Sequence, residues 1–217
     1  MPANIQSGMN AKITIGATTL LPGASKFTTS GITRGSVDAS EFGTDAARKS
    51  ETGADPGTLS ITDLIYDPFD PTQRDFVGAL KNKERFYRST ETTGIRLWVS
   101  NNTFFDLPTT AGAYMFATKA NDISTDRNGL AKCSVELAIS GGFLEAIIEY
   151  RTDGAVAATD TTIDVTDNIE IGTPQTGTIS DGTNTYAYAS WTGKTFTLAA
   201  AAGHVIADDA PLRLTFA

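Results

Sequence analysis

The single histidine of this 217-residue chain, His204, is the residue whose type best suits acid–base catalysis or metal binding. Asp208 and Asp209 follow closely, but one histidine without a second nitrogen ligand makes a poor metal site or proton relay. A turn or packing role fits His204 better. The chain also lacks a G-x-S-x-G motif, so nucleophilic hydrolase chemistry has no support. The sequence predicts that this protein is not an enzyme.

Two groups of carboxylates have spacings that chemistry could use. Asp67 and Asp70 could form the acid–base pair of a glycosidase, but helix capping explains Asp70 and a turn explains Asp67. Asp160, Asp164 and Asp167 could bind calcium, but they lack the glycine and the terminal glutamate of an EF-hand loop. The glycines form no phosphate-binding loop. We therefore expect no catalytic carboxylate, no metal and no cofactor.

Four basic side chains gather after the predicted helix: Lys81, Lys83, Arg85 and Arg88. Such a cluster could bind nucleic acid. Glu84 and Glu91 interleave with it, however, and the net charge of −8 is unfavourable for gripping phosphates. A solvated face or an ion-pairing contact between subunits fits better.

The one cysteine, Cys133, excludes an intrachain disulfide. Its neighbours alternate as in a strand, and they predict a buried thiol in a protein made in a reducing cytoplasm. The first residues lack the basic start and apolar core of a signal peptide. No apolar run approaches the roughly 20 residues that span a bilayer, so we expect no membrane insertion.

Period-two alternation of apolar and polar residues dominates the first two thirds of the chain. It predicts strands over 59–65, 95–99 and 114–118, each with one face toward a core and one toward solvent or a partner. In the first strand, Leu64 is expected on the face opposite four other side chains: Leu59, Ile61, Asp63 and Ile65.

One helix interrupts the strands. Asp70 suits the N-cap position and Pro71 the first helical position, and the helix should end within 81–83. A single apolar stripe should face the core: Phe76, Val77 and Leu80. The predicted fold class is mainly β (α+β), an antiparallel β-sandwich or barrel with one flanking helix and a small all-β C-terminal module.

The composition shifts after 150. Residues 151–217 contribute −5 of the net charge of −8, are rich in Thr, Ala and Gly, and contain only short strand patterns. We therefore divide the chain into a β-sandwich domain (1–150), a linker (151–160) and a small all-β module (161–217).

Residues 41–57 form a long charged connection without a core-forming run. One interpretation is a surface loop. The other is an arm that a neighbouring copy orders through complementary charge. The candidate interface residues of this segment are Glu41, Phe42, Asp45, Arg48, Lys49, Glu51 and Asp55. Trp98, on the polar face of its predicted strand, is either an exposed interface anchor or a core residue.

Residues 10–142 carry several motifs in a fixed order. A charged segment follows Val37-Asp38-Ala-Ser, and Gly53-Ala-Asp-Pro-Gly leads into the strand at 59–66. The helix begins with Asp-Pro-x-Gln at 70–73, and a last strand spans 131–142. In this order the motifs resemble those of the tail tube (major tail) proteins of long-tailed bacteriophages.

The resemblance implies a function in assembly. Subunits of that family form hexameric rings whose strands join into one inner barrel, and the rings stack into a tube through which DNA passes. It implies that residues 41–57 reach the adjacent ring, and that the partners are further copies, the tape measure, the tail terminator and baseplate or initiator proteins. The location would be the virion tail, and the host cytoplasm during assembly. A repeated acidic subunit would give a lining that repels DNA, although the sequence does not identify the carboxylates that face inward.

Residues 161–217 resemble a small β module appended to phage structural proteins, which in a tube would lie outside the channel. Two other functions stay open. The nearer is another phage β protein, such as a terminator, minor tail or decoration protein. The more distant is a carbohydrate-binding module with an exposed aromatic platform formed by Tyr186, Tyr188 and Trp191.

Overall fold

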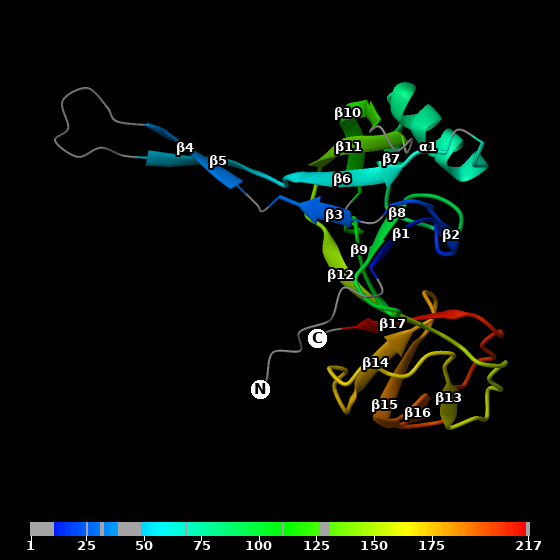
Figure 1. Ribbon diagram of the computed structural model, residues 1–217. Coiled ribbons are helices and arrows are strands. Elements are labelled where there is room, and N and C mark those ends of the chain that lie inside the picture. The colour runs from blue at the N-terminus through cyan, green and yellow to red at the C-terminus, as the bar shows by residue number, and fades with distance from the viewer. Residues whose placement is uncertain are drawn as a thin grey trace, which may run out of the picture. The chain divides into compact units, whose positions relative to one another are not determined.

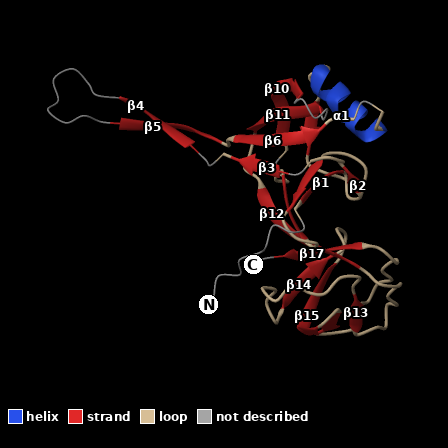
Figure 2. Cartoon of the chain, in the orientation of Figure 1, coloured by secondary structure: helices blue, strands red, loops and turns tan. Residues whose placement is uncertain are grey.

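The computed structural model describes residues 11–24, 26–30, 33–38, 49–67, 69–109, 111–125 and 131–215. They form two compact units, which we call the N-terminal unit (11–97 and 105–145) and the C-terminal unit (98–104 and 146–215). Strands dominate both units (Figures 1 and 2). Within the described residues, helix α1 (Pro71–Lys81) is the one α-helix. The predicted fold class, mainly β with antiparallel sheets and one helix, is confirmed.

The strands of the N-terminal unit fall into three groups of hydrogen-bonded neighbours. The largest has the order β3 (Lys26–Thr29), β6 (Thr58–Ile65), β11 (Ala131–Ser140), β10 (Tyr114–Thr125) and β7 (Arg85–Tyr87). A second has the order β8 (Ile95–Trp98), β1 (Lys12–Ile15) and β2 (Thr19–Leu20). The third is a hairpin of β4 (Thr33–Asp38) and β5 (Lys49–Asp55).

One core holds the N-terminal unit together. It joins apolar side chains from the first two groups of strands and from α1, including Ile13, Leu59, Ile61, Phe76, Val77, Leu80, Ile95, Leu97, Cys133 and Leu137. The predicted helix and its apolar stripe are therefore confirmed, as is the buried thiol. Asp70 caps the helix by accepting the Gln73 N–H at 2.9 Å. The buried Gln73 amide donates in turn to the carbonyls of Pro22 and Ile65, which fixes the helix start against the end of β6.

The predicted alternation along β6 is correct only in its first half. Leu59 and Ile61 are fully buried, but Leu64 is also buried and Ile65 is 40% exposed. The register against β11 shifts between Cys133 and Val135, where β6 has one more residue than its partner. Such a bulge reverses which face the following side chains occupy. The predicted placement of Leu64 and Ile65 is therefore wrong.

Strand β8 is buried on both faces, contrary to the predicted half-buried strand. Its Arg96 is 0% exposed and donates from Nε to Ser89 Oγ at 2.9 Å. The Ser89 hydroxyl donates to the buried Asp106, whose carboxylate also accepts the Leu107 N–H at 2.7 Å. A buried cation is tolerated only with such partners, and this network supplies them.

The C-terminal unit is a sheet with its own core. Its strands follow the order β13 (Thr162–Asp164), β16 (Thr195–Leu198), β15 (Thr185–Thr192), β14 (Gly177–Ser180), β17 (Pro211–Thr215), β12 (Glu145–Arg151) and β9 (Thr103–Asp106). The core includes Tyr150, Ile163, Ile179, Phe196 and Leu212, all at most 1% exposed.

The compact units divide the chain differently from the predicted domains. The C-terminal unit starts at 146 and also takes in the turn at 98–104. Thr152 and Val156, inside the predicted linker, are 1% and 5% exposed and form bridges to Val165 and Ile206. Composition alone suggested a linker, but these residues are part of the C-terminal core.

Candidate assembly surfaces

The charged segment at 41–57 is partly a strand. Lys49 and Glu51 lie in β5, opposite Asp38 and Ser36 of β4, and the hairpin forms a sheet separate from the others (Figure 1). Asp55 is exposed at the end of β5 and accepts the Gly57 N–H at 2.9 Å. Residues 49–55 of this segment therefore form a strand.

The other candidate interface residues of this segment lie outside the described residues: Glu41, Phe42, Asp45 and Arg48. Their proposed role stays a prediction.

Trp98 lies in the core. It is 6% exposed, its ring centroid lies 4.6 Å from that of Phe104, and both side chains belong to a cluster with Ile147. Of the two alternatives for Trp98, the structure therefore favours the core residue over the exposed anchor.

The five-stranded sheet has two outer strands, β3 and β7. Within the described chain, β3 pairs with β6 alone and β7 with β10 alone. The outer edges of both strands thus carry backbone groups available to another strand.

The face of this sheet that points away from the core carries aromatic side chains near β7, among them Tyr114 and Phe116, and small hydroxyl side chains over much of the rest. The hydroxyl side chains alternate with buried apolar residues along the strands and comprise Thr28, Thr58, Ser60, Thr62, Thr118, Ser134 and Ser140. Glu136 is the carboxylate among the described side chains of this face, and it accepts the Thr118 hydroxyl at 3.2 Å. Lys26 and Lys132 add positive charge, so the face is polar without being strongly acidic.

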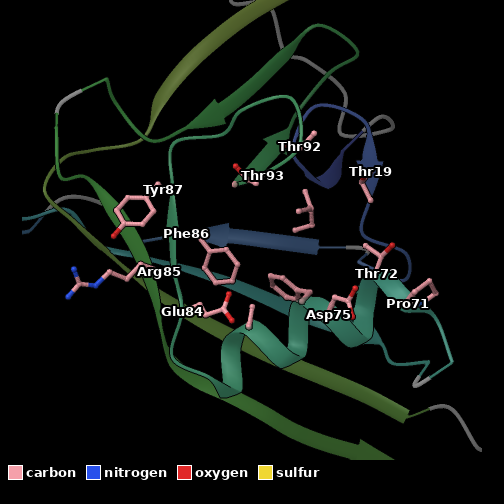
Figure 3. Close-up of a pocket in the computed structure, with 14 residues that line it drawn as sticks. Thr19, Pro71, Thr72, Asp75, Glu84, Arg85, Phe86, Tyr87, Thr92 and Thr93 are labelled. Carbon is pink, nitrogen blue, oxygen red and sulfur yellow. The ribbon is translucent and has the colours of Figure 1, made fainter.

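A groove of about 570 Å³ opens beside β7 (Figure 3). Its walls come from α1, from β1 and β2, from β7 and from the loop at 92–94. Phe76 and Phe86 line it with ring centroids 5.8 Å apart, and the carboxylates of Asp75 and Glu84 lie among the lining residues. Arg85 extends away from it in Figure 3. The groove follows the outer edge of β7, where an added strand would lie.

The four basic side chains after the helix do not act as one patch. Arg88 donates to the Leu107 carbonyl at 2.7 Å and pairs with Glu145 at 3.4 Å. Arg85 instead lies over the Tyr114 ring, with its guanidinium carbon 4.4 Å from the centroid. Both arginines therefore have partners within their own chain.

The candidate carboxylates of the C-terminal unit fix turns. Asp208 accepts the Gly154 N–H at 2.8 Å, Asp160 accepts the Ala157 N–H at 2.8 Å, and Asp164 accepts the Thr195 hydroxyl. His204 is exposed. No three His, Cys, Asp or Glu residues of the described chain lie where they could hold a metal ion. Among the helices described, none is long and apolar enough to cross a membrane.

The aromatic cluster of the C-terminal unit is mostly core. Tyr186 and Tyr188 are 5% and 2% exposed. Trp191 is half-buried and donates from Nε1 to the Pro174 carbonyl at 2.9 Å. A carbohydrate platform needs flat, exposed rings, which these side chains do not present.

Asp181 organises the turn between β14 and β15. Partial burial raises the pKa of its carboxyl, but hydrogen bonds from the Asn184 N–H, the Tyr186 hydroxyl and the Thr183 N–H outweigh it and lower the pKa from 3.8 to about 2. Burial, and then the same hydrogen bond, raises the pKa of Tyr186 to about 12. Both shifts favour the charged aspartate beside the neutral phenol.

We expect Asp181→Asn to make stability less dependent on pH in acid. The folded pKa lies below the unfolded one, so the contribution of Asp181 is present above about pH 4 and is lost as the pH falls toward about 2. Urea unfolding at about pH 6 and pH 2.5 measures this. The difference in the free energy of unfolding between about pH 6 and about pH 2.5 should be smaller in the variant than in the wild type. Asp153→Asn, an exposed control, should leave this difference unchanged. An equal pH dependence of stability in wild type and Asp181→Asn would contradict the lowered pKa of Asp181.

The comparisons leave the family of this protein open. No family model matches the sequence, and no curated protein matches it.

Proposed function

We propose that this protein is a tail tube subunit of a long-tailed bacteriophage, which forms hexameric rings that stack into a hollow conduit for DNA. The observation that carries the proposal is the hairpin of β4 and β5, which forms its own sheet where the resemblance expects the arm that reaches the next ring. A two-stranded hairpin is at best marginally stable alone in water. Contact with a neighbouring ring would supply the missing stabilisation.

The two outer strands of the five-stranded sheet suit ring closure. If β3 of one copy pairs with β7 of the next, each copy uses two different surfaces, and a head-to-tail contact of this kind closes into a ring when the rotation allows it. The groove beside β7 would then receive the neighbour's strand. Such closure removes exposed edges, which otherwise promote aggregation.

On the face of the same sheet that points away from the core, the hydroxyl-rich part along β3, β6 and β11 is the proposed channel lining. The hydroxyl side chains along these strands are short and uncharged, so they offer DNA few tight contacts. The net charge leads us to expect an acidic lining, but among the described side chains of this face one carboxylate, Glu136, is offset by Lys26 and Lys132. We therefore attribute low affinity for DNA to small hydroxyl groups more than to repulsion. The C-terminal unit would lie outside the tube, because the channel must stay open.

Sedimentation velocity over a range of protein concentrations tests the proposal. We expect a species of six times the 22.9 kDa subunit mass, followed by larger species in multiples of that ring. A single ring that never grows would favour a terminator or connector protein. A monomer at every concentration would count against self-assembly.

A further inference from the structure

Phe69 is an exposed apolar side chain, which we call the knob. Its side chain is 90% exposed, although a phenylalanine is ordinarily buried. The Asp67 carboxylate accepts the Phe69 N–H at 2.9 Å, and the Asp70 N–H donates to the Asp67 carbonyl at 3.2 Å. Phe69 thus has an aspartate near it on each side in the chain, and the backbone N–H of Phe69 is held by one of them.

A hollow of about 420 Å³ lies on the five-stranded sheet near β7. Tyr114 and Phe116 line it with ring centroids 5.9 Å apart, and Phe116 is 37% exposed. Lys83 and Arg85 bring positive charge to the same hollow. It therefore combines an aromatic wall with a basic rim, which complements an aromatic side chain flanked by carboxylates.

Knob and hollow cannot meet within one copy. Phe69 precedes α1 and Lys83 follows it, and a helix of 11 residues places its ends about 16 Å apart. The exposure of Phe69 also shows that the hollow of its own chain does not cover it.

We propose that Phe69 of one copy inserts into the hollow formed by Lys83, Arg85, Tyr114, Phe116 and Ala117 of a second copy. Asp67 and Asp70 then face the basic rim. Because knob and hollow are different surfaces, the contact is head-to-tail and adds one subunit after another. The inference rests on the proposed function in requiring self-association, and it names the side chains that form one of the contacts.

Substitutions in the knob and in the rim of the hollow test this contact. Phe69→Ala and Arg85→Glu should each weaken self-association about tenfold or more, as expected for a central aromatic anchor and its charged partner. Arg85→Lys, which keeps the positive charge of the rim, should retain much of the association. Ile171→Ala, which removes an equally exposed side chain (89%) in the other unit, is the matched control and should have no effect. Equal urea midpoints for all variants establish that each is folded.

Three results would overturn the inference. Phe69→Ala could associate like the wild type, or Arg85→Lys could be as defective as Arg85→Glu. Arg85→Glu could also leave association intact and abolish binding of a short DNA duplex, which would assign the hollow to nucleic acid. If wild-type rings and tubes form in any of these cases, the tail tube proposal stands and the knob-in-hollow contact fails. A wild type that never associates would contradict both.

Discussion

Replacing residues 41–48 by a short Gly-Ser linker should abolish tube formation and leave the folded subunit intact. The linker joins β4 directly to β5, so the hairpin remains while its candidate interface residues are lost: Glu41, Phe42, Asp45 and Arg48. If these residues contact the adjacent ring, stacking loses its complementary charges and its apolar anchor. Tubes counted by electron microscopy at equal concentration measure the effect. We expect none from the variant.

The control for this replacement is a Gly-Ser insertion after Gln175, between two exposed residues of the loop before β14. This insertion should leave tube formation unchanged. Normal tubes from the 41–48 replacement would remove this segment from the assembly mechanism, whereas loss of both tubes and folding would show a role within the subunit.

Asp106→Ala should lower the free energy of unfolding by about 3 kcal/mol or more, because it leaves the buried N–H and hydroxyl of Ser89 without their acceptor. Asp106 and Arg96 are both 0% exposed, and Ser89 links them by hydrogen bonds. The substitution also deprives the Leu107 N–H of its acceptor. Urea unfolding at neutral pH measures the loss.

Asp75→Ala is the matched control for Asp106→Ala. The Asp75 side chain is 76% exposed and pairs with Arg74 on the surface, so its removal should change stability by less than about 1 kcal/mol. A loss below about 1 kcal/mol for Asp106→Ala as well would show that the stability of the fold does not depend on this carboxylate.

The sequence predicts the helix well because its signals are local. Asp70, Pro71 and the apolar stripe lie within a few residues of one another, and they specify the cap, the first turn and the buried face. The strand pattern at 59–65 is also correct as a strand. The predicted assignment of its side chains to the two faces is wrong after Ile61, because the bulge arises from pairing with β11, far away in the sequence.

The buried polar groups are harder to predict. Arg96 looks like a solvent-facing residue in an alternating strand, but its partners Ser89 and Asp106 reach it only through the fold. Gln73 is similar, since its amide bonds depend on Pro22 and Ile65. Such residues share no short sequence pattern, and their burial becomes visible only when the strands are placed.

Parts of the candidate surfaces can likewise be predicted from the sequence, and other parts only from the structure. Charge and length single out the segment at 41–57, and the structure adds that part of it is strand β5. Sequence reasoning misses Phe69, although its place between two turn-forming aspartates is a usable signal. It includes Arg85 in a basic cluster, but the pairing of Arg85 with the Tyr114 ring requires the sheet. For Trp98 the sequence leaves an exposed anchor and a core residue equally open, and the structure places the side chain in the core.

Electron microscopy of the concentrated wild-type protein in negative stain tests the central claim most directly. The account predicts hollow tubes with a regular axial repeat and an open channel along their length. Solid particles without a channel, or separate compact discs that never stack at any concentration, would contradict a tail tube.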